Sequence, residues 1–260
     1  MKKIFIFFLI LVLVGSLHHV NVSAADQKFS WYCTRNSNNK QPLADTSLRF
    51  VEDLGGYYID HSHSDDNTDK VLYLTFDAGY ENGNIEKILN ILKEENVPGA
   101  FFVLKNLIVK NPELVKRMSN EGHLVCNHTS THNDITKYES KEDLQVDLEE
   151  LESLYEKATG KTMKKYFRPP EGNFDKKSLT FLNELGYKTV FWSFAYADWD
   201  NNAQMSSVAA KKKILDNIHN GAVVLLHPTS ATNANILKDV IIQLKAQEYR
   251  FGTLDELTQN

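Results

Sequence analysis

The stretch of sequence that decides the fold reads Val71-Leu72-Tyr73-Leu74-Thr75-Phe76-Asp77-Ala78-Gly79. Its residues 71–76 are apolar, aromatic or β-branched, which predicts a strand buried on both faces. Residues 84–95 follow, with apolar side chains at helical spacing at Ile85, Ile88, Leu89 and Leu92. A buried strand followed by an amphipathic helix is the repeating unit of a parallel α/β sheet.

The same strand–helix unit recurs along the rest of the chain. Such units join parallel strands through right-handed crossovers. Their number fits a barrel better than an open sheet, which stays the alternative. We expect further strands over residues 100–104, 124–127, 166–168, 189–194, 222–227 and 249–252. We expect the other helices over residues 113–121, 141–159, 176–185, 208–219 and 235–247.

The N-terminal residues have the pattern of an export signal. Lys2-Lys3 precede an apolar run from Ile4 to Val14, and Val22-Ser23-Ala24 supplies a small-residue cleavage site. The run is shorter than the roughly 20 residues that a membrane span needs. We therefore expect residues 1–24 to be a cleaved signal peptide, with an uncleaved anchor as the alternative. The exported protein would then have no stable membrane span.

Composition and charge are those of a globular protein that does not bind nucleic acid. Of the 260 residues, 42% are hydrophobic and 24% charged, which is enough for a large core. The net charge is −5, and removing residues 1–24 with their two lysines would make it −7. This balance disfavours phosphate binding but is compatible with a cell-wall glycan. We expect a monomer in which residues 25–65 form a polar extension packed on the barrel.

The two cysteines, Cys33 and Cys126, are too few for a disulfide framework. Whether they pair with each other does not follow from the sequence. We favour a buried thiol at Cys126 and an incidental one at Cys33.

Several titratable residues lie where the expected strands end. In an α/β barrel the functional groups gather at the carboxyl ends of the strands. Five such residues lie at or just past these ends: Asp77, His128, Arg168, Asp198 and His227. We therefore expect these side chains to meet at one rim of the barrel.

Asp77 and His227 have the positions of an acid–base pair. Asp77 precedes Gly79, which permits a tight turn, and a carboxylate held there can act as a general base. The alternative is that Asp77 caps the turn. His227 ends a buried run and can act as a general acid, with Asp198 keeping its imidazole charged. The alternative for His227 is a hydrogen-bonded core histidine.

His128 and His132 are candidate metal ligands. Imidazole is a common ligand of divalent metals, and two rings one helical turn apart can point at one ion. Zinc proteases of the HExxH class need glutamate after the first histidine, where Thr129 stands here, which disfavours that class. Ordinary surface or loop-capping histidines are the alternative.

Arg168 stands before Pro169-Pro170, which fix the direction of the backbone. Arginine is well suited to orienting a carboxylate. The alternative is a surface salt bridge at the end of a strand.

Taken in order, these blocks resemble the polysaccharide deacetylases that share the NodB homology domain, carbohydrate esterase family 4. The family pattern T-F-D-D-G corresponds to residues 75–79, and H-[ST]-x-x-H corresponds to residues 128–132. The other matching blocks are R-x-P-x-G at residues 168–172, Asp198-Trp199, and Leu225-Leu226-His227. The resemblance covers residues 66–257, and the ordered set of blocks is far more specific than any one of them.

This resemblance implies a fold and an activity. The fold would be a single-domain, distorted (β/α)7 barrel over residues 66–257. The activity would be hydrolysis of a linear amide, the N-acetyl group of a sugar. Asp77 would be the base and Arg168 would orient it, while His227 would be the acid with support from Asp198.

The resemblance also implies a metal site and a substrate site. His128 and His132 would hold a divalent metal ion, which we expect to be zinc. The backbone amide of Glu171, directly after Pro170, would bind the oxyanion, as preorganised donors do in acyl transfer. Trp199 and Leu225 would form the walls of the acetyl pocket.

Ala78 departs from the family pattern. The pattern has a second aspartate at this position, where it ligates the metal, but a methyl group cannot coordinate an ion. We therefore expect the ion to be held more weakly than in the family as a whole.

Residues 75–83, 191–196 and 226–233 resemble more narrowly one branch of the family. That branch deacetylates N-acetylmuramic acid after the peptide stem is removed, leading to muramic δ-lactam in the spore cortex. It implies peptidoglycan glycan strands as partner and the cell wall, in the forespore cortex, as location. The alternatives are a deacetylase of N-acetylglucosamine or chitin-like polymers, a xylan esterase, and a non-catalytic glycan-binding module. A module has no need for a base and an acid.

Overall fold

The centre of the molecule is strand β5 (Lys70–Ala78), which is nearly all buried. The computed structural model describes residues 27–35 and 39–259. Strands around β5 run in the order β11-β5-β6-β7-β8-β10-β4, and all of the pairings along this order are parallel. The bounds of these neighbours are β4 (Gly56–Tyr57), β6 (Ala100–Val103), β7 (Leu124–Asn127), β8 (Tyr166–Phe167), β10 (Lys188–Val190) and β11 (Ala222–Leu226).

The sheet curves back on itself through the segment after β10. Phe194 forms a parallel bridge with Val224 of β11, and Leu225 N–H donates to the Phe194 carbonyl at 2.9 Å. Strand β12 (Tyr249–Phe251) pairs with β5 at residues 70–72, on the side that β6 occupies from Thr75 onward. The expected distorted α/β barrel in a single domain is confirmed.

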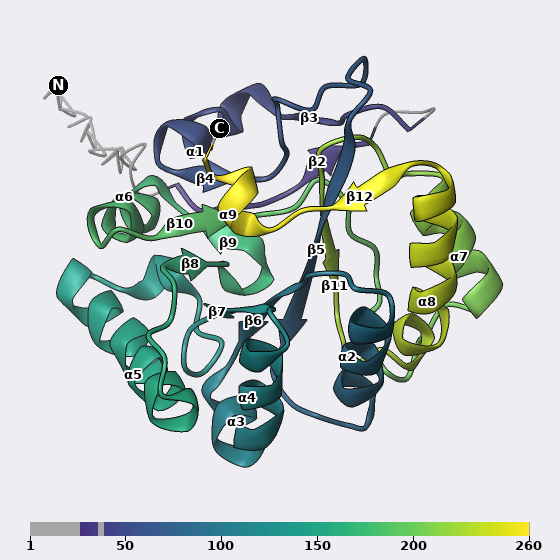
Figure 1. Ribbon diagram of the computed structural model, residues 1–260. Coiled ribbons are helices and arrows are strands. Elements are labelled where there is room, and N and C mark those ends of the chain that lie inside the picture. The colour runs from purple at the N-terminus through teal and green to yellow at the C-terminus, as the bar shows by residue number, and fades with distance from the viewer. Residues whose placement is uncertain (1–26, 36–38, 260) are drawn as a thin grey trace, which may run out of the picture.

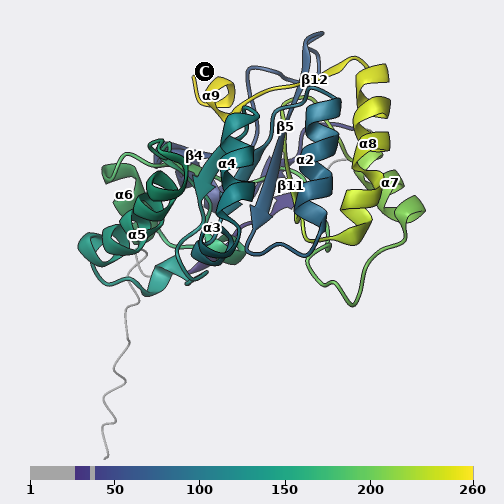
Figure 2. The same ribbon diagram turned by 60° about the horizontal axis from the view of Figure 1, so that its bottom comes forward.

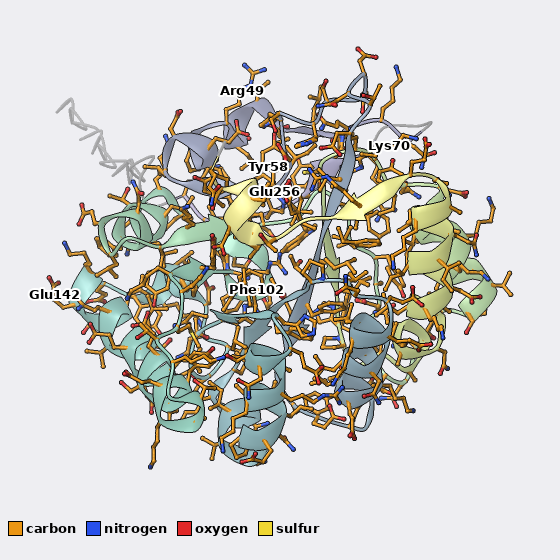
Figure 3. All side chains as sticks on the ribbon, in the orientation of Figure 1. Arg49, Tyr58, Lys70, Phe102, Glu142 and Glu256 are labelled. Atoms are coloured by element: carbon orange, nitrogen blue, oxygen red, sulfur yellow. The ribbon has the colours of Figure 1, made fainter. Side chains whose placement is uncertain are left out.

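Helices surround the sheet (Figures 1 and 2). Along β5, the side chains of Leu72, Leu74 and Phe76 face the helices, whereas Tyr73 packs inside the barrel with Phe102. Figure 3 accordingly shows Phe102 near the centre and Glu142 on the periphery. The helices are α2 (Asn84–Glu94), α3 (Lys105–Lys110), α4 (Pro112–Asn120), α5 (Lys141–Thr159), α6 (Lys176–Glu184), α7 (Ser207–Leu215), α8 (Ala231–Ala246) and α9 (Leu254–Leu257).

The segment before β5 is attached to the barrel by backbone pairing. Strand β1 (Phe29–Ser30) pairs antiparallel with β9 (Asn173–Phe174), and β4 pairs in parallel with β10 as the last strand of the sheet order. The remaining short elements are β2 (Cys33–Thr34), β3 (Leu43–Ala44), α1 (Phe50–Asp53), η1 (Thr46–Leu48), η2 (Ile135–Lys137) and η3 (Pro170–Gly172).

Some element bounds differ from the sequence prediction. Helix α3 was not expected, and the strand expected over residues 189–194 keeps regular pairing only to Val190. Helix α8 begins at Ala231 instead of Asn235. The Ser230 side chain accepts a hydrogen bond from the backbone N–H of Asn233 and so caps the start of the helix.

Helix α7 ends at Leu215 instead of His219. The loop that replaces its expected last turn brings Asn220 inward. There the Asn220 side-chain amide donates to the carbonyls of Ser64, Asn67 and Asp69.

Both thiols are free, with Cys126 buried and Cys33 partly buried. The expected signal peptide at residues 1–24 lies outside the described residues. Among the residues that are described, no helix is long and apolar enough to cross a membrane.

Candidate active site

A cavity of about 660 Å³ opens where the strands end at their carboxyl side. Asp77 enters it from β5, His128 from just beyond β7, and His227 from just beyond β11. Its other lining residues are Gly79, Tyr80, Leu104, His132, Glu171, Gly172, Trp192, Ala195, Tyr196, Trp199, Leu225 and Thr229.

Asp77 is held from behind by Arg168. The Arg168 Nη1 group donates to Asp77 Oδ1 at 2.8 Å, which leaves Oδ2 on the side of His128, 3.6 Å from Nε2 of that ring. Burial by itself raises the pKa of Asp77. Opposing influences, of which the charge of Arg168 is the largest, outweigh burial and hold this pKa below its usual value. Asp77 is therefore ionised at neutral pH.

Arg168 lies directly after β8 and is completely buried. Its Nε donates to the Val190 carbonyl, and its Nη2 donates to Thr75 Oγ1 and to the Phe191 carbonyl, at 2.8–3.0 Å. The guanidinium also lies 4.2 Å from the centre of the Phe102 ring. The alternative of a surface salt bridge is therefore wrong, because every hydrogen bond of this guanidinium is made inside the barrel.

His128 is buried with its tautomer fixed by the backbone. Its Nδ1 lies 2.8 Å from the Arg168 carbonyl, and a carbonyl only accepts, so Nδ1 carries the proton and Nε2 keeps its lone pair. Burial lowers the pKa of His128 to about 4, which leaves the ring neutral at neutral pH. Neutral imidazole with a free Nε2 is the form that ligates metals.

His132 is exposed, and its ring lies 5.1 Å from that of His128 at an angle of 71°. The two rings meet through a loop and not through a helical turn, since Thr129 and His132 have φ of 69° and 63°. The helical-turn geometry considered from the spacing is therefore wrong, although both rings line the same cavity.

The donors at this point fit a metal ion only as a pair of imidazoles. Within residues 27–35 and 39–259, no group of three or more His, Cys, Asp or Glu could hold an ion. Ala78 is fully buried in the core and offers no ligand. The free Nε2 of His128 and the neighbouring His132 ring fit an ion whose other positions are left to water or substrate.

His227 is bound to Asp198 at two points. The Nδ1 of His227 lies 2.7 Å from Asp198 Oδ1, and the His227 backbone N–H donates to Asp198 Oδ2 at 2.8 Å. Burial by itself lowers the pKa of His227, but the hydrogen bond and charge of Asp198 outweigh it, and the pKa is raised above its usual value. With Nδ1 committed to Asp198, Nε2 is the nitrogen left to exchange a proton in the cavity.

Asn233 completes this arrangement, and sequence reasoning did not single it out. Its side-chain amide donates to Asp198 Oδ2 at 2.6 Å and to the His227 carbonyl at 3.1 Å, while its Oδ1 accepts from Tyr196 O–H. Asn233 lies in the first turn of α8, so the misplaced start of that helix hid it. Thr75 was predicted as the first residue of the T-F-D-D-G pattern, but its hydrogen bond with Arg168 was not expected.

The expected substrate residues fall into two groups. Glu171 and Leu225 line the cavity, whereas Pro170 is buried and does not line it. Trp199 also lines the cavity but is 62% exposed, so it lies on the rim. Tyr80, 45% exposed on the same rim, was not expected; its hydroxyl accepts from Asn201 Nδ2 at 2.7 Å.

Comparison with known proteins identifies the family of this chain. Residues 64–190 match the polysaccharide deacetylase family. The chain is 38% identical to the peptidoglycan-N-acetylmuramic acid deacetylase PdaA of Bacillus subtilis, over 89% of this chain and 86% of that protein. It is 32% identical to a peptidoglycan-N-acetylglucosamine deacetylase of Bacillus cereus, over 74% of this chain and 89% of the relative.

Solved structures agree with the sequence relatives. The structure of Bacillus subtilis PdaA, a family 4 carbohydrate esterase, has a TM-score of 0.83 and covers 89% of this chain and 97% of that one at 38% identity. A family 4 carbohydrate esterase from Bacillus anthracis has a TM-score of 0.73 at 34% identity and covers 90% and 97% of the two chains. This chain therefore belongs to the polysaccharide deacetylases of carbohydrate esterase family 4, and it is a hydrolase.

Proposed function

We propose that this protein is exported and removes the acetyl group of N-acetylmuramic acid in peptidoglycan, leading to muramic δ-lactam in the spore cortex. One observation carries the hydrolytic part of the proposal. Asp77 and His227 face the same cavity, each held by its own charged partner, Arg168 and Asp198. Amide hydrolysis requires a base that takes a proton from water and an acid that protonates the departing amine. The partners of Asp77 and His227 favour these two protonation states.

In this proposal two separate protons are transferred, one to Asp77 and one from His227. Asp77 Oδ2, the oxygen not bonded to Arg168, takes a proton from the attacking water as the C–O bond forms. As the C–N bond breaks, His227 Nε2 gives its proton to the departing amine, and acetate leaves. The Glu171 amide stabilises the oxyanion, and Leu225 and Trp199 enclose the acetyl methyl.

His128 and His132 would hold the divalent ion, which we propose to be zinc. When bound, such an ion polarises the acetamide carbonyl and lowers the pKa of water. The chain contributes the fixed tautomer of His128 through the Arg168 carbonyl.

The muramic acid substrate is supported by the curated relative that is named for it and by the motif blocks shared with that branch. Incubation of the purified protein with peptide-stripped glycan strands should release acetate, at a higher rate than chitin oligomers or acetylated xylan. Faster release from chitin oligomers would favour N-acetylglucosamine as substrate, which the Bacillus cereus relative is named for. Binding of glycan with no acetate released from any substrate would indicate a non-catalytic module.

The δ-lactam part of the proposal is tested in the bacterium. Mass spectrometry of muropeptides from a strain lacking the protein should show that δ-lactam is lost.

The pH profile of the enzyme is expected to depend on Asp198. His227 must be protonated to act as an acid, and Asp198 raises its pKa, so activity should fall as the pH rises through that pKa. Asp198→Asn removes the charge, lowers the pKa of His227, and should move the alkaline limb of kcat/KM to lower pH. Asp200→Asn, an exposed change on the same loop, should leave the limb in place. An unshifted limb in Asp198→Asn would count against His227 as the acid.

Metal retention is expected to be weak. With two imidazoles and no carboxylate from residue 78, the zinc-loaded protein should retain well under one ion per chain after dialysis into metal-free buffer. Its acetate release should fall in step and return when zinc is added. The matched variant Ala78→Asp restores a ligand type and should retain more. Stoichiometric zinc in the dialysed wild-type protein would contradict this expectation.

A further inference from the structure

The segment of residues 29–35 lies against two walls of the cavity although it does not line the cavity itself. Arg35 donates from Nη2 to the Ala195 carbonyl, and Cys33 Sγ donates to the Trp192 carbonyl at 3.6 Å. Trp192 and Ala195 both line the cavity. This segment therefore holds the backbone of two residues that line the active-site cavity.

Trp31 is the residue of this segment with the strongest connections. It is 4% exposed, and its backbone N–H donates to the Gly172 carbonyl at 2.8 Å. Its indole Nε1 donates to the Trp192 carbonyl, also at 2.8 Å. Through its backbone and its side chain, this single residue links the turn after β8 to the segment after β10.

The turn that Trp31 holds has an unusual backbone. Glu171 has φ of 56° and Gly172 has φ of 68°, both in the left-handed region, which costs free energy for a residue with a side chain. A Cβ at Gly172 would lie 2.7 Å from the Trp192 ring and 3.2 Å from the Trp31 Cβ. Gly172 therefore lies between the Trp192 ring and the Cβ of Trp31, which leaves little room for the turn to change its conformation.

Trp31 also reaches the base through Phe191. The indole stacks on the Phe191 ring with 4.5 Å between ring centres. The Phe191 carbonyl accepts from Nη2 of Arg168, and Arg168 orients Asp77. Displacement of residues 191–192 would consequently disturb both the arginine and the turn.

From these contacts we infer that Trp31, which lies before residues 64–190, is a positioning residue of the deacetylase, an inference that rests on the proposed function. It acts by fixing the Glu171 amide and the Phe191–Trp192 backbone relative to Asp77. Misplacement of such groups by about 1 Å can cost on the order of 10²-fold in rate.

Trp31→Phe is the sharpest test, because phenylalanine keeps the stacking on Phe191 and removes the Nε1 donor. With peptide-stripped glycan strands, kcat for acetate release should fall about tenfold or more while KM stays within about twofold. The matched control is Phe50→Leu, since Phe50 packs on the same aromatic cluster through Phe29 and Phe174 without bonding either cavity wall. This control should keep its kcat.

Hydrogen exchange supplies a readout that does not depend on substrate. Peptides covering residues 169–174 and 191–196 should exchange faster in Trp31→Phe than in wild type or Phe50→Leu, with the remaining peptides unchanged. Unchanged exchange there, or equal losses of kcat in the two variants, would overturn the positioning role and leave the proposed function intact. A wild-type protein that releases no acetate from any glycan would overturn the proposed function, and the positioning role with it.

Discussion

Asp77→Asn is expected to lower kcat for acetate release by about 10²–10⁴-fold. Asparagine has the same shape and can still accept the hydrogen bond from Arg168 Nη1, but its amide cannot take a proton from water. The loss should appear in kcat more than in KM, because the proton transfer belongs to the transition state. Acetate release at saturating glycan is the measurement.

Far-UV circular dichroism should accompany this measurement, because Arg168 loses its counter-charge in the variant. Asp239→Asn, an exposed change in a surface ion pair with Lys211, is the matched control and should retain full activity. Undiminished activity of a folded Asp77→Asn protein would exclude Asp77 as the base.

Arg168→Met is expected to reduce both the free energy of unfolding and the activity. Arg168 is fully buried, and the Asp77 side chain is only 11% exposed, so removing one partner leaves a desolvated charge and costs about 3–5 kcal/mol. Without the guanidinium, burial of Asp77 is no longer opposed by that charge, and the pKa of its carboxyl rises. A smaller fraction of Asp77 is then ionised and able to act as the base. Urea unfolding and kcat/KM together measure the two effects.

Two further variants test the reason for this loss. Arg168→Lys keeps the charge but cannot reproduce the planar set of bonds to Asp77, Thr75 and two carbonyls, so it should restore only part of the stability. The double variant Asp77→Asn/Arg168→Met should be less destabilised than the sum of the single changes, because it removes both charges and leaves neither buried without its partner. Additive losses would show that the two side chains are not coupled.

The alternation of strands and helices could be predicted because the central strands are buried apolar runs, whereas the choice of a barrel over an open sheet came from the resemblance to the family. Burial on both faces makes β5 and β11 readable without knowledge of their neighbours. Tertiary contacts decided the rest. Residues 191–194 leave regular pairing to close the barrel on β11, and Ser230 starts α8 within a polar stretch that resembles a loop.

The titratable residues of the candidate site were predictable for a related reason. A titratable side chain directly after a buried apolar run is expected at the end of a strand, where it can reach the cavity, as Asp77 and His227 do. Asn233 and Trp31 carry no such signature, because amides and indoles are common in ordinary turns and cores. Their importance lies in contacts across long sequence separations, which no local pattern contains.

Strand β4 has a consequence for anyone who shortens this chain. It accepts hydrogen bonds from the Thr189 and Phe191 amides through the Gly55 and Tyr57 carbonyls, and so covers the outer side of β10. A recombinant protein begun at residue 64, where the family match starts, would lose this cover. Its uncovered edge would be a template for strand addition between molecules, so self-association during purification is the expected outcome.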